Sequence, residues 1–333
     1  MKIDQPLIID PPIKALNHHA MFLGVLFLNP TYHNYFSAHY VNLYYDFSSD
    51  FLNFIIPKFY TEEFFFVSTE IGYDIPDIIT ESCFFEQILH MMDKGYYLYT
   101  DVNERYIPNR HAYQKYDFSQ SILFYGLETS QKKMNSIAYA ICNTDDSFQY
   151  TAEELSYFDF IKSIKNMHER NYIHFFKNKA EYLFSFDINL LLLQLKDYIN
   201  SQNTAFPEQC NPNRVYGIRI YDAVIEYFKS SEMTRPGEAI YLMKTTKLLL
   251  EHKQCMLQRI KYMDSNNIIA SKNYILEYNK IVQTFTKIHH LSIKYTFTQS
   301  VATKELICKE IKKTVEMENS ILQKLISDIE SNK

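Results

Sequence analysis

The chain has 333 residues, of which 47% are hydrophobic and 22% charged, as is typical of a folded globular chain and not of a disordered one. Its net charge of −5, without any Lys/Arg block, makes it a poor candidate for binding a nucleic-acid backbone. It has only 6 glycines and no glycine-rich phosphate motif, which excludes most nucleotide-dependent enzymes.

The cysteines and the apolar runs indicate the compartment. The 5 cysteines lie far apart without a CxxC pair, which argues against a disulfide framework or a zinc finger and fits a reducing compartment. The longest apolar run, residues 20–28, is much shorter than the roughly 20 residues of a membrane-spanning helix. Residues 1–12 lack the apolar stretch of a signal peptide. We therefore expect a soluble cytoplasmic protein with no membrane partner.

The first third of the chain predicts one arm, two helices and a strand. Residues 1–14 contain Pro6, Pro11 and Pro12 and are interpreted as an extended arm. The apolar run over residues 18–28 stops before a proline and predicts a buried helix. Two further elements follow: a buried strand over residues 64–67, and an amphipathic helix over residues 81–92 that Gly95 ends.

Aromatic and β-branched residues predict three strands next, over residues 96–102, 121–127 and 137–142. The last two are expected to form an antiparallel hairpin with a long polar loop. Thr151 and Glu154 match a capping box, which predicts a helix from there to about residue 167. With a further strand over residues 172–176, residues 1–180 predict an α+β domain with an antiparallel sheet.

The pattern after residue 180 is helical. Asp187 is placed to cap a helix whose apolar residues follow i, i+3, i+4 spacing. The same spacing recurs over the stretches 218–228, 237–263, 275–285 and 307–329. Short connections predict an antiparallel helical bundle over residues 181–333, with its clearest loop over residues 201–213. The last apolar stripe either packs inside the chain or pairs with a second copy in a homodimer.

Short motifs occur in a recognisable order. An apolar helix is preceded by Asn17-His18-His19, and a later strand ends in Asp101-Val102. Tyr106-Ile107-Pro108 follows, and then a strand that starts at Ser119 and ends in Tyr125-Gly126. This order resembles the papain-like fold of the leader-peptide peptidases and of the butirosin-biosynthesis-protein-H-like acyltransferases. Residues 216–223 and 250–253 also resemble the helical part of the second of these families.

The resemblance implies a fold, an activity and partners. It implies a papain-like N-terminal half, and transfer of an acyl or aminoacyl group from an acyl or peptidyl carrier protein. The acceptor would be a small-molecule amine or a peptide. In that reading the site lies between the first helix and the two strands that end at Val102 and Gly126.

The chain departs from the family at the residues that do the chemistry. The resemblance implies a Cys at the start of the first helix, but Asn17, His18 and His19 stand there, and the first cysteine is Cys83. It implies a His at the start of the second strand, where Ser119, Gln120 and Ser121 stand. The third member falls near Cys142-Asn143. Because nucleophile and base act only through each other, we expect either a pseudoenzyme or relocated chemistry.

Relocated chemistry has a few candidate residues. His18 and His19 are candidates for a general base or acid, Asp101 for the group that orients it, and Ser121 for a hydroxyl in the site. Each also has a plain reading: a histidine pair at a helix entry and a strand-end aspartate that caps a turn. The candidates for substrate contact are Asn17, Tyr106, Cys83 and Asn143. Cys83 reads equally well as a small core residue.

No metal or cofactor is expected. His18, His19, His33 and His39 are close in sequence, but no carboxylate or Cys completes a known ligand spacing. Three hypotheses about function remain. The protein is an accessory factor of peptide or other natural-product biosynthesis that transfers an acyl or aminoacyl group. Alternatively, it is a non-catalytic papain-like protein that binds or scaffolds a partner. In the third hypothesis it is a helical oligomerisation or regulatory protein whose last two helices pair with another chain.

Overall fold

The computed structural model describes residues 1–56, 66–72, 81–141, 148–167, 172–179, 181–231, 238–269 and 273–332. The chain forms two compact units, Met1–Tyr32 with Lys58–Leu183 and His33–Pro57 with Phe184–Lys333. The boundary expected near residue 180 agrees with the passage of the chain from the first unit to the second after Leu183. The chain also passes between the units after Tyr32 and after Pro57. Residues 33–57 group with the helical half, so the helical unit contains an inserted N-terminal segment.

The first unit is built on an antiparallel sheet with the strand order β4-β9-β5-β6-β7-β8, and with β1 paired to β6. Its strands are β1 (Lys2–Asp4), β4 (Phe66–Gly72), β5 (Tyr97–Asn103), β6 (Ser119–Glu128), β7 (Lys133–Ile141), β8 (Phe148–Ser156) and β9 (Tyr172–Asn178). Its helices are α1 (Asn17–Leu26), α3 (Glu81–Asp93) and α4 (Tyr157–Lys165), and a 3-10 turn covers Glu104–Tyr106. A mixed α+β architecture is confirmed for this half of the chain.

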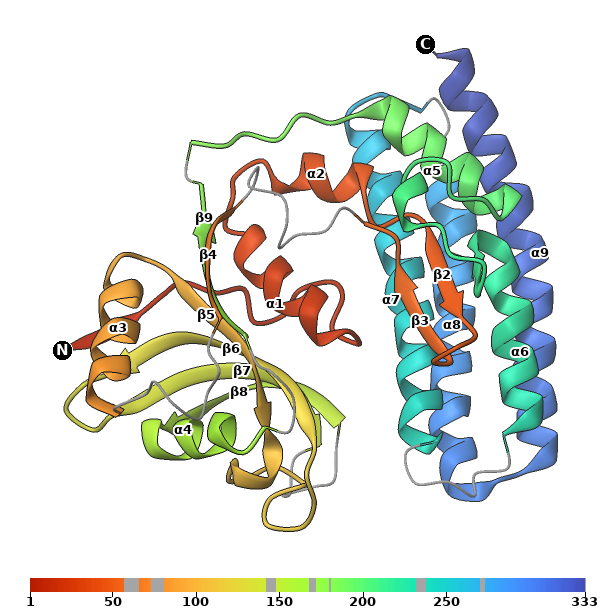
Figure 1. Ribbon diagram of the computed structural model, residues 1–333. Coiled ribbons are helices and arrows are strands. Elements are labelled where there is room, and N and C mark those ends of the chain that lie inside the picture. The colour runs from red at the N-terminus through yellow and green to blue at the C-terminus, as the bar shows by residue number, and fades with distance from the viewer. Residues whose placement is uncertain are drawn as a thin grey trace. The chain divides into compact units, whose positions relative to one another are not determined.

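Helices cover both faces of this sheet (Figure 1). Side chains of a strand alternate between the two faces. On one face the Phe22 ring of α1 contacts Tyr99, with ring centroids 5.4 Å apart, and Phe176, at 4.7 Å. On the other, Phe124 contacts Phe160 of α4, and Phe160 stacks on Phe84 of α3. α1 thus packs on one face of the sheet, and α3 and α4 pack on the opposite face.

Helix α1 agrees with the helix expected over residues 18–28. It is buried along almost its whole length, from Asn17 to Leu26 with His18 only partly exposed. A helix that is apolar all round is stable only inside a core, which explains why this short element forms without a side-chain cap. It ends ahead of Pro30, as the sequence predicts.

The helix predicted from Thr151 is wrong. Residues from Phe148 to Ser156 form β8, which pairs with β7, and the helix α4 begins only at Tyr157. The true cap is Ser156: its hydroxyl accepts from the Asp159 backbone N–H at 3.0 Å and donates to the Asp159 carboxylate at 2.6 Å. Pairing with a long neighbouring strand outweighs a capping pattern that is satisfied equally well a few residues later.

Two further expectations need correction. The N-terminal arm is extended, but Lys2–Asp4 is strand β1, which pairs with the end of β6 in the register Ile3↔Leu127. The loop between β6 and β7 is shorter than expected because the strands continue to Glu128 and from Lys133. Lys132 turns the chain there with a positive φ of 47°. Only residues 66 and 67 of the strand expected over residues 64–67 are described, and they begin β4.

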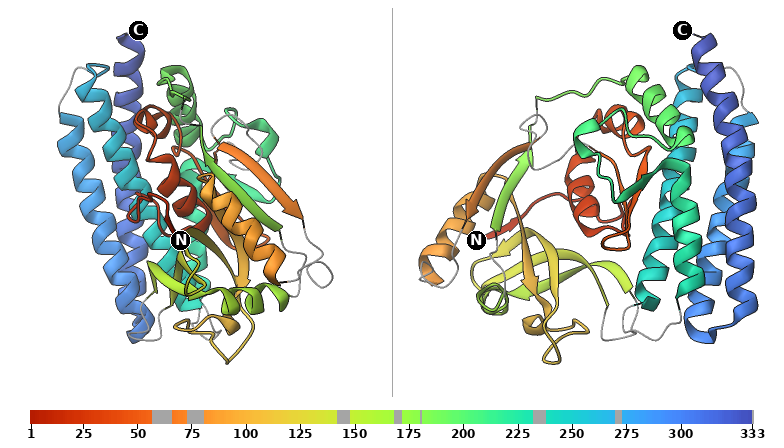
Figure 2. Two further views of the ribbon diagram at one scale, coloured as in Figure 1. Left: turned by 90° about the vertical axis from the view of Figure 1, so that its left-hand side faces the viewer. Right: turned by 45° about the vertical axis from the view of Figure 1, so that its right-hand side comes forward.

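The second unit is the predicted helical bundle. Its helices are α2 (Tyr32–Ala38), α5 (Ile188–Asn200), α6 (Ile220–Ser230), α7 (Glu238–Ser265), α8 (Asn273–Thr298) and α9 (Val301–Ser331). The two views of Figure 2 show α7, α8 and α9 running side by side. Asp187 caps α5 as predicted, because its carboxylate accepts from the backbone N–H groups of Asn189 and Leu190. Among the described residues no helix is long and apolar enough to cross a membrane.

The apolar stripe of α9 is buried within this unit. Ile307, Ile311 and Leu325 are fully inaccessible to solvent. The stripe expected either to pack inside the chain or to pair with a second copy therefore packs inside the chain.

A small sheet in the helical unit was not expected from the sequence. β2 (Leu43–Asp46) pairs with β3 (Phe51–Phe54) and with β10 (Arg214–Tyr216), all antiparallel. Two of these strands belong to the inserted segment and one to the helical half, so the sheet ties them together. Short 3-10 turns over Pro207–Gln209 and Gly217–Arg219 complete the unit.

Candidate functional site

The first residue of α1 lies beside strand β6. The Asn17 side-chain amide donates to the Ser121 carbonyl at 3.3 Å, across a sequence separation of 104 residues. α1 packs on the sheet through the Phe22 ring, and β6 presents Ser121 to the same face. The structure therefore brings together the start of the first helix and the start of the second strand, where the resemblance places nucleophile and base.

The Ser121 hydroxyl is the centre of a short hydrogen-bond chain. It donates to the Asp101 carboxylate at 2.6 Å and accepts from the Tyr99 hydroxyl at 3.1 Å. β5 and β6 are paired with Asp101 opposite Ser121, so the antiparallel register itself produces this contact. We call Asn17, Tyr99, Asp101 and Ser121 the Asn17–Ser121 cluster. Tyr99 was not singled out in the sequence, although it lies two residues before Asp101 and must share its face.

The two histidines of α1 differ in their surroundings. His18 is partly exposed, and burial lowers its pKa to about 4, so its imidazole is neutral at neutral pH. His19 is buried, with 2% of its surface exposed, and its ring lies against that of His18 with centroids 4.3 Å apart. A base with so low a pKa is weak, because proton abstraction is favoured when the pKa lies near the working pH.

The remaining candidates lie elsewhere or outside the described residues. Tyr106 ends the 3-10 turn after β5, and the Lys162 ammonium of α4 lies 5.3 Å from its ring. Cys83 is exposed on α3, which covers the face of the sheet opposite α1. The structure thus separates Cys83 from the Asn17–Ser121 cluster. Asn143 falls in residues 142–147, outside the described part of the chain.

The histidines do not gather into a metal site in the described ranges. His18 and His19 belong to the first unit and His33 and His39 to the second. Within the described residues, no three His, Cys, Asp or Glu side chains are arranged to hold a metal ion.

The chemistry open to the Asn17–Ser121 cluster is limited. A carboxamide at position 17 is neither a nucleophile nor a base, and the Ser121 hydroxyl directs its proton to a carboxylate instead of an imidazole. The cluster therefore offers a neutral amide and a hydroxyl whose hydrogen bonds fix its orientation, and it contains no thiol–imidazole couple.

No family model matches this chain, and no curated protein matches it.

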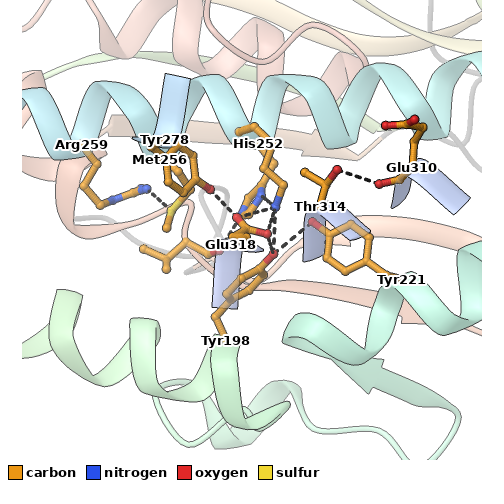
Figure 3. Close-up of polar contacts among 11 residues, drawn as sticks. Tyr198, Tyr221, His252, Met256, Arg259, Tyr278, Glu310, Thr314 and Glu318 are labelled. Carbon is orange, nitrogen blue, oxygen red and sulfur yellow. Dashed lines mark hydrogen bonds and ion pairs between the residues drawn. The ribbon is translucent and has the colours of Figure 1, made fainter. Parts of the chain in front are cut away.

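A second polar cluster lies inside the helical unit, and the sequence analysis missed it (Figure 3). Lys253 of α7 and Glu318 of α9 form an ion pair at 2.7 Å with both side chains fully inaccessible. Hydroxyls and an imidazole surround them, and we call these six residues the Lys253 cluster: Tyr198, Tyr221, His252, Lys253, Tyr278 and Glu318. Glu318 lies seven residues after Ile311 on the apolar stripe of α9, which is a signal that the sequence offered.

Proposed function

We propose that this chain is a non-catalytic member of the papain-like acyltransferase and peptidase group, which serves natural-product or peptide biosynthesis in the cytoplasm as a binding or scaffold protein. Its ligand is the acyl or aminoacyl group of a loaded carrier protein, or the amine or peptide that receives it. It binds this ligand on the α1 face of the first unit and does not turn it over.

One observation carries the proposal: the contact between Asn17 and Ser121. A helix start and a strand start meet there as in a papain-like site, but through an amide and a backbone carbonyl. This contact supports a papain-like scaffold in which the groups that would form and attack an acyl-enzyme are replaced. Such a site retains polar groups for binding and loses the chemistry.

The polar groups that remain suit recognition of an acyl or peptidyl carbonyl. Asp101 and Ser121 are partly exposed on the sheet, and neutral His18 offers either a donor or an acceptor. Phe22 is buried beneath them against Tyr99 and Phe176, so α1 is fixed to the sheet. Rigid support of this kind lowers the entropic cost of binding.

One contact favours acyl transfer as a second candidate function. The 2.6 Å hydrogen bond from Ser121 to Asp101 is the geometry of a hydroxyl that a carboxylate can deprotonate. In that case the Ser121 oxygen would attack the acyl carbonyl, its proton would pass to Asp101, and the carrier protein would leave as the bond to its acyl group breaks. The amine would then attack the Ser121 ester, form the amide and release the Ser121 hydroxyl. The absence of an imidazole between hydroxyl and carboxylate makes this the weaker function of the two.

Binding and turnover are separated by one experiment on the full chain. Carrier protein loaded with an acyl or aminoacyl group is titrated against the protein by calorimetry, and the same mixture with amine is followed by intact mass. We expect binding without product. His18→Ala and Asp101→Asn should each weaken binding by about tenfold, which corresponds to one lost polar contact. Glu86→Gln, exposed on α3 across the sheet, is the matched control and should bind normally.

Product that depends on Ser121 would replace binding by acyl transfer as the function, and the absence of any binding would contradict both functions.

The papain-like scaffold itself is tested by introducing the cysteine–histidine couple that the resemblance implies. In a Cys83→Ser/Cys210→Ser background, which removes both exposed thiols found among the described residues, Asn17→Cys is compared with Asn17→Cys/Ser121→His. In a papain-like geometry the second variant should react with iodoacetamide at least tenfold faster at pH 6, because an imidazolium stabilises the thiolate. Equal rates would contradict the papain-like arrangement.

A further inference from the structure

The Lys253 ammonium is surrounded by acceptors. It donates to both carboxylate oxygens of Glu318 at 2.7 Å, to the Tyr198 hydroxyl at 2.9 Å, and it lies 3.1 Å from Nδ1 of His252. The rings of Tyr198, Tyr221 and Phe285 lie 4.9 to 5.3 Å from it. Burial lowers the pKa of Lys253 to about 8, so the group is still an ammonium at neutral pH.

The ammonium and the Val41 carbonyl together determine which nitrogen of His252 carries the proton. An ammonium has only donors, so Nδ1 of His252 accepts from it. The ring is neutral, because burial and the neighbouring Lys253 charge lower its pKa well below its usual value. Its one proton is on Nε2, which donates to the Val41 carbonyl at 2.8 Å, a group that can only accept. Lys253 thus reinforces the one tautomer in which His252 can hold the Val41 carbonyl.

Val41 lies in the inserted segment, His33–Pro57, which is held by side chains of the bundle through its carbonyls. Arg259 donates from Nε to the Ser37 carbonyl at 2.7 Å, and its Nη2 donates to the His39 carbonyl. The Gln194 amide of α5 donates to the Ala38 carbonyl at 2.6 Å. Ser37 and Ala38 belong to the last turn of α2 and His39 follows it, so these are the acceptors that a helix end leaves unsatisfied. The contact from His252 continues this series.

From these contacts we infer that Glu318, Lys253 and His252 form a positioning chain that fixes the inserted segment in the bundle. Glu318 holds the Lys253 ammonium, Lys253 favours the Nε2–H tautomer of His252, and His252 holds the backbone at Val41. The chain runs from α9 through α7 to the loop between α2 and β2. All three residues act through one another, and none of them is a catalytic residue.

The burial of the chain supports a role in conformational specificity. Two apolar side chains would be less costly to bury than a Lys–Glu pair, since both ions lose their hydration. Other helices also supply polar partners: Tyr278 of α8 donates to Glu318, and the hydroxyls of Tyr198 and Tyr221 lie 3.0 Å apart. A network of this kind is satisfied in one packing arrangement only, and it therefore selects the docked position of the segment.

The inference concerns the helical unit alone and stands apart from the proposed function. Its test uses the full chain labelled with ¹⁵N-histidine. The His252 nitrogen shifts should identify a neutral ring protonated on Nε2, unchanged from pH 7 to pH 5. Lys261→Met is the control, because Lys261 lies on the same helix and is exposed to solvent. It should leave the His252 signals unchanged.

Lys253→Met/Glu318→Leu removes both charges, so it is expected to fold where a single variant fails. In this variant only the Val41 carbonyl still selects the Nε2–H tautomer of His252, so the Nδ1–H tautomer should become detectable. Hydrogen exchange should speed up at least tenfold at the Leu43 and Ile55 amides, which depend on Asn42 beside Val41. A folded double variant with the Nε2–H tautomer intact and unchanged exchange overturns the inference. Altered exchange without a change of tautomer assigns the effect to packing and overturns it as well.

Discussion

The two polar clusters of this protein differ in what surrounds them. In the Asn17–Ser121 cluster, Tyr99, Asp101 and Ser121 lie on a sheet and are partly exposed. The bond between Tyr99 and Ser121 joins two neutral groups, and the bond from Ser121 to Asp101 involves one charged group. In the Lys253 cluster, the ion pair is fully buried between helices. Water screens the first and is excluded from the second. The first is suited to contact with a ligand, and the second to fixing the structure, so substitutions should affect them on different scales.

The largest effect is expected at Lys253. Lys253→Met leaves Glu318 charged and buried, which should lower the free energy of unfolding by about 3–5 kcal/mol. Lys253→Met/Glu318→Leu removes the stranded charge and should recover most of that loss. Chemical unfolding followed by circular dichroism measures both. A single variant that loses less than about 1 kcal/mol would place the pair on the same scale as surface ion pairs and remove the contrast.

Gly217 should be the next most sensitive position. A Cβ there would lie 2.2 Å from the Tyr198 carbonyl oxygen, and the residue has a φ of +55°. Gly217→Ala combines a clash with backbone strain and should cost roughly 2–4 kcal/mol. The matched control is Gly95→Ala, at a φ of +84° with nothing within 4 Å. It carries the strain alone, about 1 kcal/mol. Equal losses would mean that the approach to Tyr198 relaxes freely.

A smaller effect should appear in acid at His18. Its pKa is lowered from 6.5 to about 4 in the folded chain, so the unfolded chain binds more protons between these values. Stability therefore falls as the pH drops from 6.5 toward 4, by about 1–2 kcal/mol at pH 5. His18→Gln should remove this part of the pH dependence. Because His39 and His289 have pKa values lowered in the same direction, the measurement is the difference between the two unfolding curves. If the pH dependence of the free energy of unfolding is the same with and without His18, then His18 is solvated in the folded chain.

The smallest effect is expected in the Asn17–Ser121 cluster itself. Ser121→Ala removes hydrogen bonds to Asp101 and Tyr99 that solvent can replace, so the expected loss is about 1 kcal/mol. Ser119→Ala, exposed two residues earlier on β6, should stay within about 0.5 kcal/mol of the parent chain. A loss at Ser121 as large as that at Lys253 would show that this cluster stabilises the fold and would weaken its assignment to ligand binding.

The elements that the sequence predicted well are those with a strong local signal. α1 follows from the length of its apolar run, α3, α5 and the long C-terminal helices follow from apolar periodicity, and Asp187 caps α5 as its residue type suggests. The capping box at Thr151 misled because a local pattern competes with strand pairing. β8 forms because it pairs with β7 over nine residues. A short stretch of sequence around Thr151 does not include β7, so it cannot reveal this pairing.

The sequence by itself determined an antiparallel α+β half followed by helices, and the missing Cys and His at the two motif positions. Only the tertiary structure decided that Asn17 meets Ser121, that Asp101 pairs across from it, and that residues 33–57 belong with the bundle. Likewise, Lys253 and Glu318 lie 65 residues apart and meet only through the packing of α7 and α9. Periodicity reports the environment of each segment, whereas register and long-range packing depend on contacts between segments that are distant in the chain.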